Sequence, residues 1–126
     1  MYKVEISNAG DSAFKVKSKD YEFVVDTKGK GISPPDTLLA SLGTCVGVYI
    51  RKYSEGGKLD LKEFSVSVEA EFSSEKPIRF KSIGVRVDLK GAALDERRKL
   101  SLLEFIKNCP VHNTLEGKPE IAIEIR

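Results

Sequence analysis

The sequence predicts an α+β fold in which helices pack against antiparallel sheet, in the element order βββ-α-ββ-α-β. Short strand-forming segments with polar turns begin the chain, and two longer segments with alternating apolar and polar residues lie in its middle. One helical pattern precedes that pair and another follows it. With 126 residues, of which 40% are hydrophobic, the chain is long enough for one core and short for two. We therefore expect a single domain over residues 1–126.

The N-terminal segments are expected to form a three-stranded antiparallel meander. The strand patterns cover residues 2–7, 13–17 and 21–25, with polar turn residues between them. Residues 26–32 contain two glycines and show no periodicity. They are therefore expected to form the loop that leads into the first helix.

The first helix is predicted from its start signals. Ser33 is placed as N-cap, Pro34 takes the first helical position, and Asp36 completes a capping box. The helix is expected to end near residue 54, just before a Gly-Gly pair.

No charged residue occurs between residues 38 and 50, and a helix that is apolar on every face must be buried on every face. Small residues such as Gly43 and Gly47 also allow another helix to approach closely. Because a chain this small does not enclose such a helix completely, we predict that it lies at a homodimer interface.

The rest of the chain is predicted as a hairpin, a helix and a strand. Residues 64–72 and 83–89 alternate apolar and polar side chains across a turn at 73–77, as paired strands do. Residues 94–108 have a helical pattern, with acidic side chains in the first turn that favour the helix dipole. The isoleucines at 121, 123 and 125 predict a final strand.

Composition excludes several classes of partner. Lys and Arg number 21 against 19 Asp and Glu, and the two signs are interleaved, so nucleic acid is not an expected partner. The N-terminus lacks the apolar region of a secretory signal, and no apolar run approaches the ~18 residues that span a bilayer. We expect a cytoplasmic protein without a membrane segment. In a reducing cytosol, two cysteines are more often free thiols, transient redox partners or metal ligands than a permanent disulfide.

Cys109 opens the tetrad Cys-Pro-Val-His, which gives it a local reason to form a thiolate, the nucleophilic form of cysteine. The proline after Cys109 ends the preceding helix and starts a new turn with Cys109 as N-cap, where backbone N–H groups and the helix dipole favour negative charge. His112 would then add positive charge or accept the thiol proton. The alternative is a simple helix break with a buried cysteine and a surface histidine.

Cys45 has no such local support. In an apolar helix, burial raises the pKa of a cysteine and makes it inert. Tyr49, one turn later, is placed either to offer a hydroxyl hydrogen bond or to serve as a core tyrosine. A metal site built from Cys45, Cys109, His112 and Asp36 has no support in the ligand spacing, since the chain has one His and no Cys-x-x-Cys pair. We expect no metal.

The two cysteine segments together resemble the OsmC family, the osmotically inducible and organic hydroperoxide resistance proteins. Residues 33–45, Ser-Pro-Pro-Asp-Thr-Leu-Leu-Ala-Ser-Leu-Gly-Thr-Cys, are similar to the family's Pro-x-Glu/Asp-Leu-Leu-Leu-Ala-Ala/Ser-Leu-Gly-x-Cys pattern. Arg51 follows this segment, and residues 109–115 are similar to the family's Cys-Pro-Val-His/Ser segment. The element order is also similar along the whole chain.

The resemblance implies an OsmC-like fold that forms an intertwined homodimer, with the central helices between sheets and the thiols at the subunit interface. It implies reduction of organic hydroperoxides, with Cys45 as the peroxidatic residue and Cys109 as the resolving one. Their disulfide would be reduced by an external dithiol, without metal, flavin or haem.

The chain departs from the family pattern around Cys45. Hydroperoxide reductases of the family hold the thiolate with an Arg from the N-terminal strands, paired with a Glu, whereas this chain has no Arg before Arg51. Arg51 is the first cation to test, although it lies about 120° around the helix from Cys45, and its alternative is a solvated helix-end charge. Asp36 takes the acidic position but lies about half a turn from the Cys45 face, which favours its capping role.

Two further functional classes follow from these departures. One is a non-enzymatic thiol redox sensor, or a small-molecule-binding dimer, with little peroxidase activity. The other is a structural protein with inert cysteines.

Overall fold

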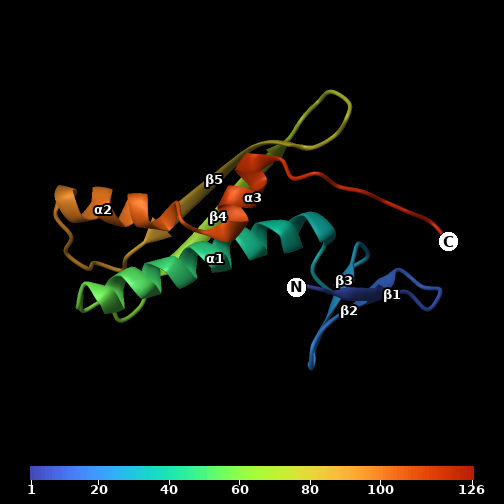
Figure 1. The fold of residues 1–126 in the computed structure, drawn as a ribbon, viewed down its shortest axis with the longest axis horizontal. Helices are drawn as coiled ribbons and strands as arrows, with labels where there is room; N and C mark the ends of the chain where they lie inside the picture. The colour runs from blue at the N-terminus through green and yellow to red at the C-terminus, as the bar shows by residue number, and fades with distance from the viewer. The chain divides into compact units, whose positions relative to one another are not determined.

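The computed structural model describes all 126 residues. They divide into two compact units, Met1–Ala40 and Ser41–Arg126. The prediction of one domain over residues 1–126 stays a prediction. The elements, shown in Figure 1, are β1 (Glu5–Ser7), β2 (Ala13–Ser18), β3 (Tyr21–Asp26), α1 (Pro34–Gly56), β4 (Ser65–Phe72), β5 (Phe80–Asp88), α2 (Glu96–Ile106) and α3 (Pro110–Gly117). None of the helices has the length and apolar character needed to span a membrane.

The N-terminal unit contains the predicted meander. Its sheet has the order β1-β2-β3, and both pairs are antiparallel. The loop after β3 is closed by Asp26, whose buried carboxylate accepts hydrogen bonds from the backbone N–H groups of Lys28 at 2.9 Å and Lys30 at 3.1 Å. The helix α1 begins as predicted, since Ser33 Oγ accepts a hydrogen bond from the backbone N–H of Asp36 at 3.2 Å.

The core of the C-terminal unit lies along one face of α1. Leu42, Val46 and Ile50 are buried there together with Leu61 and Leu102, which come from the loop after α1 and from α2. Residues 38–50 of α1 carry no charge on any face, but one chain buries only part of this stretch. Val48, on another face, is 51% exposed.

The predicted hairpin is present as β4 and β5, which pair antiparallel with Val66 opposite Val87 and Val68 opposite Val85. The hairpin packs on α1 where that helix has small side chains. A Cβ added to Gly43 would lie 3.0 Å from the Val68 side chain. The small residues of α1 therefore admit a strand of the hairpin, whereas the sequence predicted the approach of a helix.

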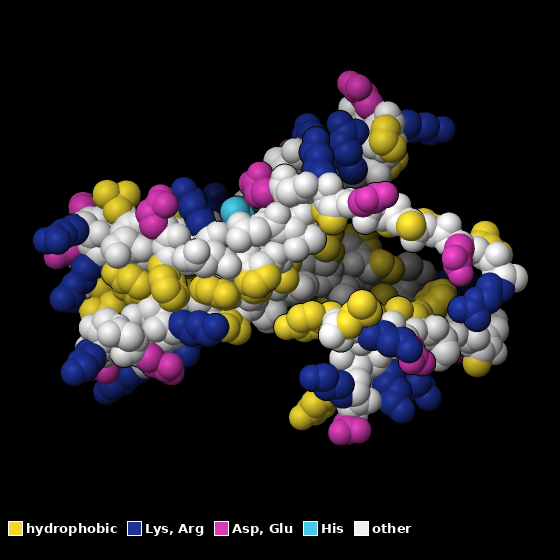
Figure 2. All heavy atoms as spheres, in the orientation of Figure 1, with side chains coloured by type: hydrophobic (Ala, Val, Ile, Leu, Met, Phe, Trp, Pro, Cys, Tyr) yellow, Lys and Arg dark blue, Asp and Glu magenta, His cyan; other side chains and the backbone are white.

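The predicted second helix is present as α2, with its ends about two residues inside the expected range. Its N-cap Asp95 accepts a hydrogen bond from the backbone N–H of Arg98 at 2.8 Å. Aromatic side chains join it to α1, because the Phe105 ring lies 5.8 Å from that of Tyr49 and 5.7 Å from that of Tyr53. Figure 2 shows a band of hydrophobic side chains between α1 and α2, with charged side chains on the outer faces.

The prediction of a final strand at residues 121–125 is wrong for the single chain in this structure. Residues 118–126 have no helix or strand, and Ile121, Ile123 and Ile125 are 78%, 86% and 94% exposed. The alternating pattern is that of a strand with one buried face, but a strand also needs a neighbour for its backbone N–H and C=O groups. Within the single chain, no strand pairs with this segment.

Candidate functional site

The structure brings the two cysteines together within one chain. Cys45 lies on α1 and is half-buried, while Cys109 lies between α2 and α3 and is 0% exposed. The Cys109 side chain is close enough to Cys45 to raise the pKa of its thiol, and both cysteines are free thiols. Residues far apart in the sequence therefore form a thiol pair, which is the arrangement that a disulfide cycle requires.

The N-terminus of α3 acts on both cysteines. Cys109 is the N-cap of this helix, and its Sγ accepts a hydrogen bond from the backbone N–H of His112 at 3.4 Å. The backbone N–H of Val111 lies near Cys45 and lowers the pKa of its thiol. Pro110, at the first helical position, has no N–H, so Val111 and His112 carry the first donors of the helix. The predicted N-cap role of Cys109 is confirmed.

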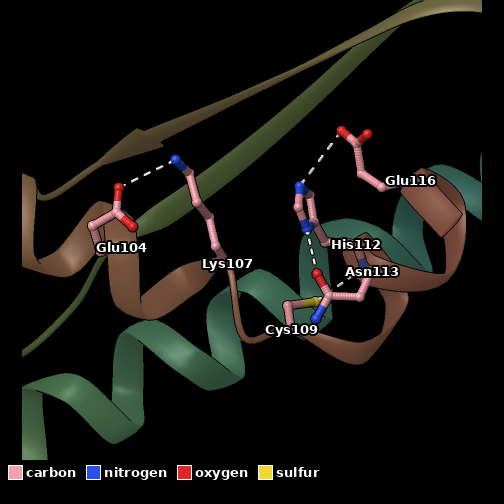
Figure 3. Close-up of polar contacts among 6 residues, drawn as sticks. All are labelled: Glu104, Lys107, Cys109, His112, Asn113 and Glu116. Carbon is pink, nitrogen blue, oxygen red and sulfur yellow. Dashed lines mark hydrogen bonds and ion pairs between the residues drawn. The ribbon is translucent and has the colours of Figure 1, made fainter.

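The imidazole of His112 does not face the thiols. Its Nδ1 lies 3.0 Å from Asn113 Oδ1, and its Nε2 lies 3.8 Å from Glu116 Oε1, as Figure 3 shows. The contact of His112 with Cys109 is made by the backbone. The ring is therefore engaged with side chains of α3, and its predicted role as a local charge or proton acceptor for Cys109 stays a prediction.

The surroundings of Cys45 favour the protonated thiol. Burial is the largest effect and raises the pKa of Cys45 above 9.0, and the neighbouring Cys109 raises it further. The Val111 N–H and the positive charge of Lys52 act in the opposite direction. The predicted effect of burial on this cysteine is thus seen, together with two groups that oppose it.

Lys52 is the cation that sequence reasoning missed. It follows Cys45 by seven residues, which is about two turns of helix, so both residues lie on the same side of α1. Its Nζ lies 4.8 Å from the centroid of the Tyr49 ring, which lies between the two along this side. The contacts of Tyr49 are made by its ring, with Lys52 and Phe105, in accordance with the core-tyrosine interpretation.

Arg51 is engaged elsewhere. Its guanidinium donates hydrogen bonds to the carbonyl oxygens of Leu61 at 2.6 Å and Lys62 at 3.4 Å, and its Cζ lies 5.1 Å from the centroid of the Phe64 ring. These contacts tie the loop after α1 to the helix. Arg51 therefore makes its contacts with this loop and not with Cys45, and it is not a solvated helix-end charge.

Asp36 belongs to the N-terminal unit, where its backbone N–H is capped by Ser33. The structure holds no group of three or more His, Cys, Asp or Glu side chains that is arranged to bind a metal ion.

Comparison with known proteins shows the family of this chain. The family model described as OsmC-like protein matches residues 27–124, which include both cysteines. The chain belongs to the OsmC-like family.

Solved structures with a similar fold include other OsmC-like proteins. The OsmC-like protein from Mycoplasma pneumoniae is 20% identical, with a TM-score of 0.80 over 93% of this chain and 88% of that chain. An organic hydroperoxide resistance protein OsmC from Legionella pneumophila, also described as a predicted redox protein, is 19% identical, with a TM-score of 0.66 over 93% and 91%. An organic hydroperoxide resistance protein from Elizabethkingia anophelis, with thiocyanate bound, is 17% identical, with a TM-score of 0.64 over 93% and 90%. The search of curated proteins gives no match.

These likenesses confirm the predicted fold class and the family resemblance. In this OsmC-like chain, Cys45 comes from α1 and Cys109 from the start of α3, and the charge of Lys52 is the smallest of the effects on the pKa of Cys45. Cys45, Tyr49 and Lys52 are spaced by four and three residues, which places them on one side of a helix. This spacing could have identified Lys52 from the sequence.

Proposed function

We propose that this OsmC-like protein is a thiol peroxidase that reduces organic hydroperoxides through a disulfide cycle of Cys45 and Cys109. The observation that carries the proposal is the contact of the two thiols within one chain, beside the N-terminus of α3. Two free cysteines close together, with backbone N–H groups of α3 acting on both, suit the formation of a thiolate and then of a disulfide.

The cycle has three chemical steps. The Cys45 thiolate attacks the terminal oxygen of the hydroperoxide, which breaks the O–O bond, leaves Cys45 as a sulfenic acid and releases an alcohol after protonation. The Cys109 thiolate then attacks the Cys45 sulfur and expels hydroxide, which takes up a proton to give water and leaves the Cys45–Cys109 disulfide. Two external thiols, or one dithiol, reduce that disulfide and are themselves oxidised to a disulfide.

Cys45 is assigned as the attacking residue because its sulfur is the more accessible of the two. A hydroperoxide must reach the sulfur it oxidises, and Cys109 is 0% exposed while Cys45 is half-buried. Burial also keeps the Cys45 thiol protonated at neutral pH, which slows the first step. The Val111 N–H and Lys52 oppose this effect and are the supporting groups within the chain.

The working unit is proposed to be a homodimer. The partly exposed apolar face of α1, with Val48 51% exposed, is suited to being covered by a second copy. The exposed isoleucines 121, 123 and 125 have the pattern of a strand and lack a neighbour in the single chain, so pairing with the second copy would complete them. Light scattering at micromolar protein concentration tests this, and a monomer would contradict the dimer.

The second candidate is a non-enzymatic thiol sensor or small-molecule-binding dimer. One observation for it is the raised pKa of Cys45, which disfavours rapid turnover. Another is a groove of about 470 Å³ beside α3, whose walls come from α1, β5, α2 and α3 and are mainly apolar, with Lys107, His112 and Glu116 among its polar residues. A groove of that size and character is typical of small-molecule sites.

The deciding experiment measures consumption of cumene hydroperoxide by the purified protein with dihydrolipoamide as reductant. We expect Cys45→Ser to abolish turnover. Cys109→Ser is expected to allow one oxidation of Cys45 but to form no intramolecular disulfide. A wild-type rate in Cys45→Ser would contradict the peroxidase. A wild-type protein that forms the disulfide with hydroperoxide but is not turned over by the dithiol would favour the sensor.

A further inference from the structure

The two sulfurs of the thiol pair differ in access from solvent. Cys109 is enclosed by its own chain and is 0% exposed, at the junction of α2 and α3. Cys45 is half-buried. A partner subunit can add cover to either residue but cannot remove the cover that the chain itself places over Cys109. Within the single chain, Cys109 is therefore less accessible to solvent than Cys45.

The two sulfurs also differ as leaving groups. When a thiolate attacks a disulfide, one sulfur forms the new bond and the other departs with the electron pair of the broken bond. Departure is faster for the sulfur whose thiolate is better stabilised. Cys109 is the N-cap of α3 and accepts the His112 N–H at 3.4 Å, at the positive end of the helix dipole. The start of α3 therefore provides a backbone N–H donor to the sulfur that would depart.

We propose that the external thiol which regenerates the protein attacks the sulfur of Cys45, and that Cys109 leaves as the thiolate. This inference rests on the disulfide of the proposed function. In the first exchange, the external thiolate forms a bond to Cys45 Sγ, the Cys45–Cys109 bond breaks, and its electron pair stays on Cys109. A second external thiolate then attacks the external sulfur of the mixed disulfide, which releases the reduced Cys45 and the oxidised external disulfide.

Access sets the order of exchange, because Cys109 is fully covered by its own chain and Cys45 is not. Attack at Cys109 would require the chain to open locally where α2 and α3 meet, because this residue is 0% exposed. The mixed disulfide on Cys45 keeps the external group at the more accessible sulfur. The same residue is therefore the point of entry for both oxidant and reductant, while Cys109 reacts only with Cys45.

The test uses the full-length protein oxidised with diamide, which forms the disulfide without hydroperoxide and is therefore independent of peroxidase activity. The oxidised protein receives a short pulse of glutathione, is quenched with acid, and is then alkylated with N-ethylmaleimide. Trypsin separates the two cysteines into residues 31–51 and 108–126, so mass spectrometry locates the glutathione on one or the other. We expect glutathione on Cys45 and maleimide on Cys109, at a ratio of at least about ten to one.

Two controls separate the causes. In denaturant, the ratio is expected to fall toward one, because both sulfurs are then accessible. His112→Ala keeps the backbone N–H and removes the ring, and it is expected to leave the ratio unchanged. Glutathione mainly on Cys109, equal labelling in the folded protein, or failure of diamide to form the disulfide would each overturn the inference. Failure of the proposed function is a different result, namely formation of this disulfide by diamide without consumption of hydroperoxide.

Discussion

The neighbouring cations Arg51 and Lys52 are predicted to have opposite roles, one in stability and one in thiol chemistry. The test replaces each by methionine, which keeps an unbranched apolar side chain and removes the charge. Arg51→Met loses the hydrogen bonds to the carbonyl oxygens of Leu61 at 2.6 Å and Lys62 at 3.4 Å and the cation–π contact at 5.1 Å from the Phe64 ring. Lys52→Met loses the cation on the Cys45 side of α1.

The size of the first effect follows from these contacts. A hydrogen bond from a charged donor contributes about 1.5–3 kcal/mol, and the contact at 3.4 Å adds little to the one at 2.6 Å. A partly exposed cation–π contact contributes about 0.5–1 kcal/mol. Some of this is recovered because water solvates the freed carbonyl groups, so we expect a loss of about 2 kcal/mol. For a chain of 126 residues, that lowers the melting temperature by about 5–10 °C.

The second effect is electrostatic and smaller. Lys52 is exposed, so its interaction with the Cys45 thiolate is weakened by solvent and by salt. We expect Lys52→Met to slow the alkylation of Cys45 by about two- to threefold at low ionic strength, and less in 1 M salt. Its melting temperature is expected to stay within about 2 °C of the wild type.

Both variants are measured by thermal denaturation followed by circular dichroism and by iodoacetamide alkylation of Cys45, with mass spectrometry on residues 31–51. The expected result is a crossed pattern. Arg51→Met lowers stability and leaves Cys45 reactivity unchanged. Lys52→Met slows the alkylation of Cys45 and leaves stability unchanged. If Arg51→Met slowed Cys45 without a loss of stability, the family-derived role of Arg51 would be restored and the geometric argument refuted.

Three further predictions concern pH and packing. The alkylation rate of Cys45 should continue to rise above pH 9.0, because burial raises its pKa and only the thiolate reacts; a plateau below pH 8 in a pH series would contradict this. Gly43→Val should destabilise the protein by about 1–3 kcal/mol in urea denaturation, because the space next to it is taken by Val68, and an unchanged midpoint would show that the hairpin is free to shift. The backbone N–H of Lys28 lowers the pKa of Asp26 below 3.8, so that carboxylate stabilises the folded state above pH 3.8 and this contribution is lost as the pH falls through the folded-state pKa. Asp26→Asn should therefore melt at a lower temperature than the wild type at pH 7, with the difference narrowing in acid, and an equal difference at pH 7 and pH 2 would argue against it.

Local sequence signals predicted the elements whose stability is local. The meander, the hairpin of β4 and β5, and the start of α1 each depend on alternation or capping within a few residues, and all are present. The strand predicted at 121–125 was wrong because a strand is completed by a neighbour, and the pattern does not say which chain supplies it. α3 was predicted only as a turn capped by Cys109, and the structure extends it to residue 117.

The site divides in the same way. The N-cap position of Cys109 was predictable from the proline that follows it, and Lys52 was predictable from helical spacing although it was overlooked. The position of Arg51 was not, because its hydrogen bonds depend on where the loop carbonyl groups at 61 and 62 pass in space. The contact of Cys45 with Cys109 joins two helices distant in sequence and needed either the family resemblance or the structure.

The Cys-Pro-Val-His tetrad acts mainly through its backbone. Pro110 starts α3 and contributes no N–H, so the first two donors of the helix belong to Val111 and His112. The His112 N–H donates to Cys109, and the Val111 N–H lowers the pKa of Cys45, so a single helix start acts on both cysteines. The side chains at these two positions are not required for those hydrogen bonds, and the imidazole is turned to Asn113 and Glu116. Because these donors belong to the backbone of α3, their positions do not depend on side-chain rotamers, and this is the structural reason for treating the two cysteines as one site.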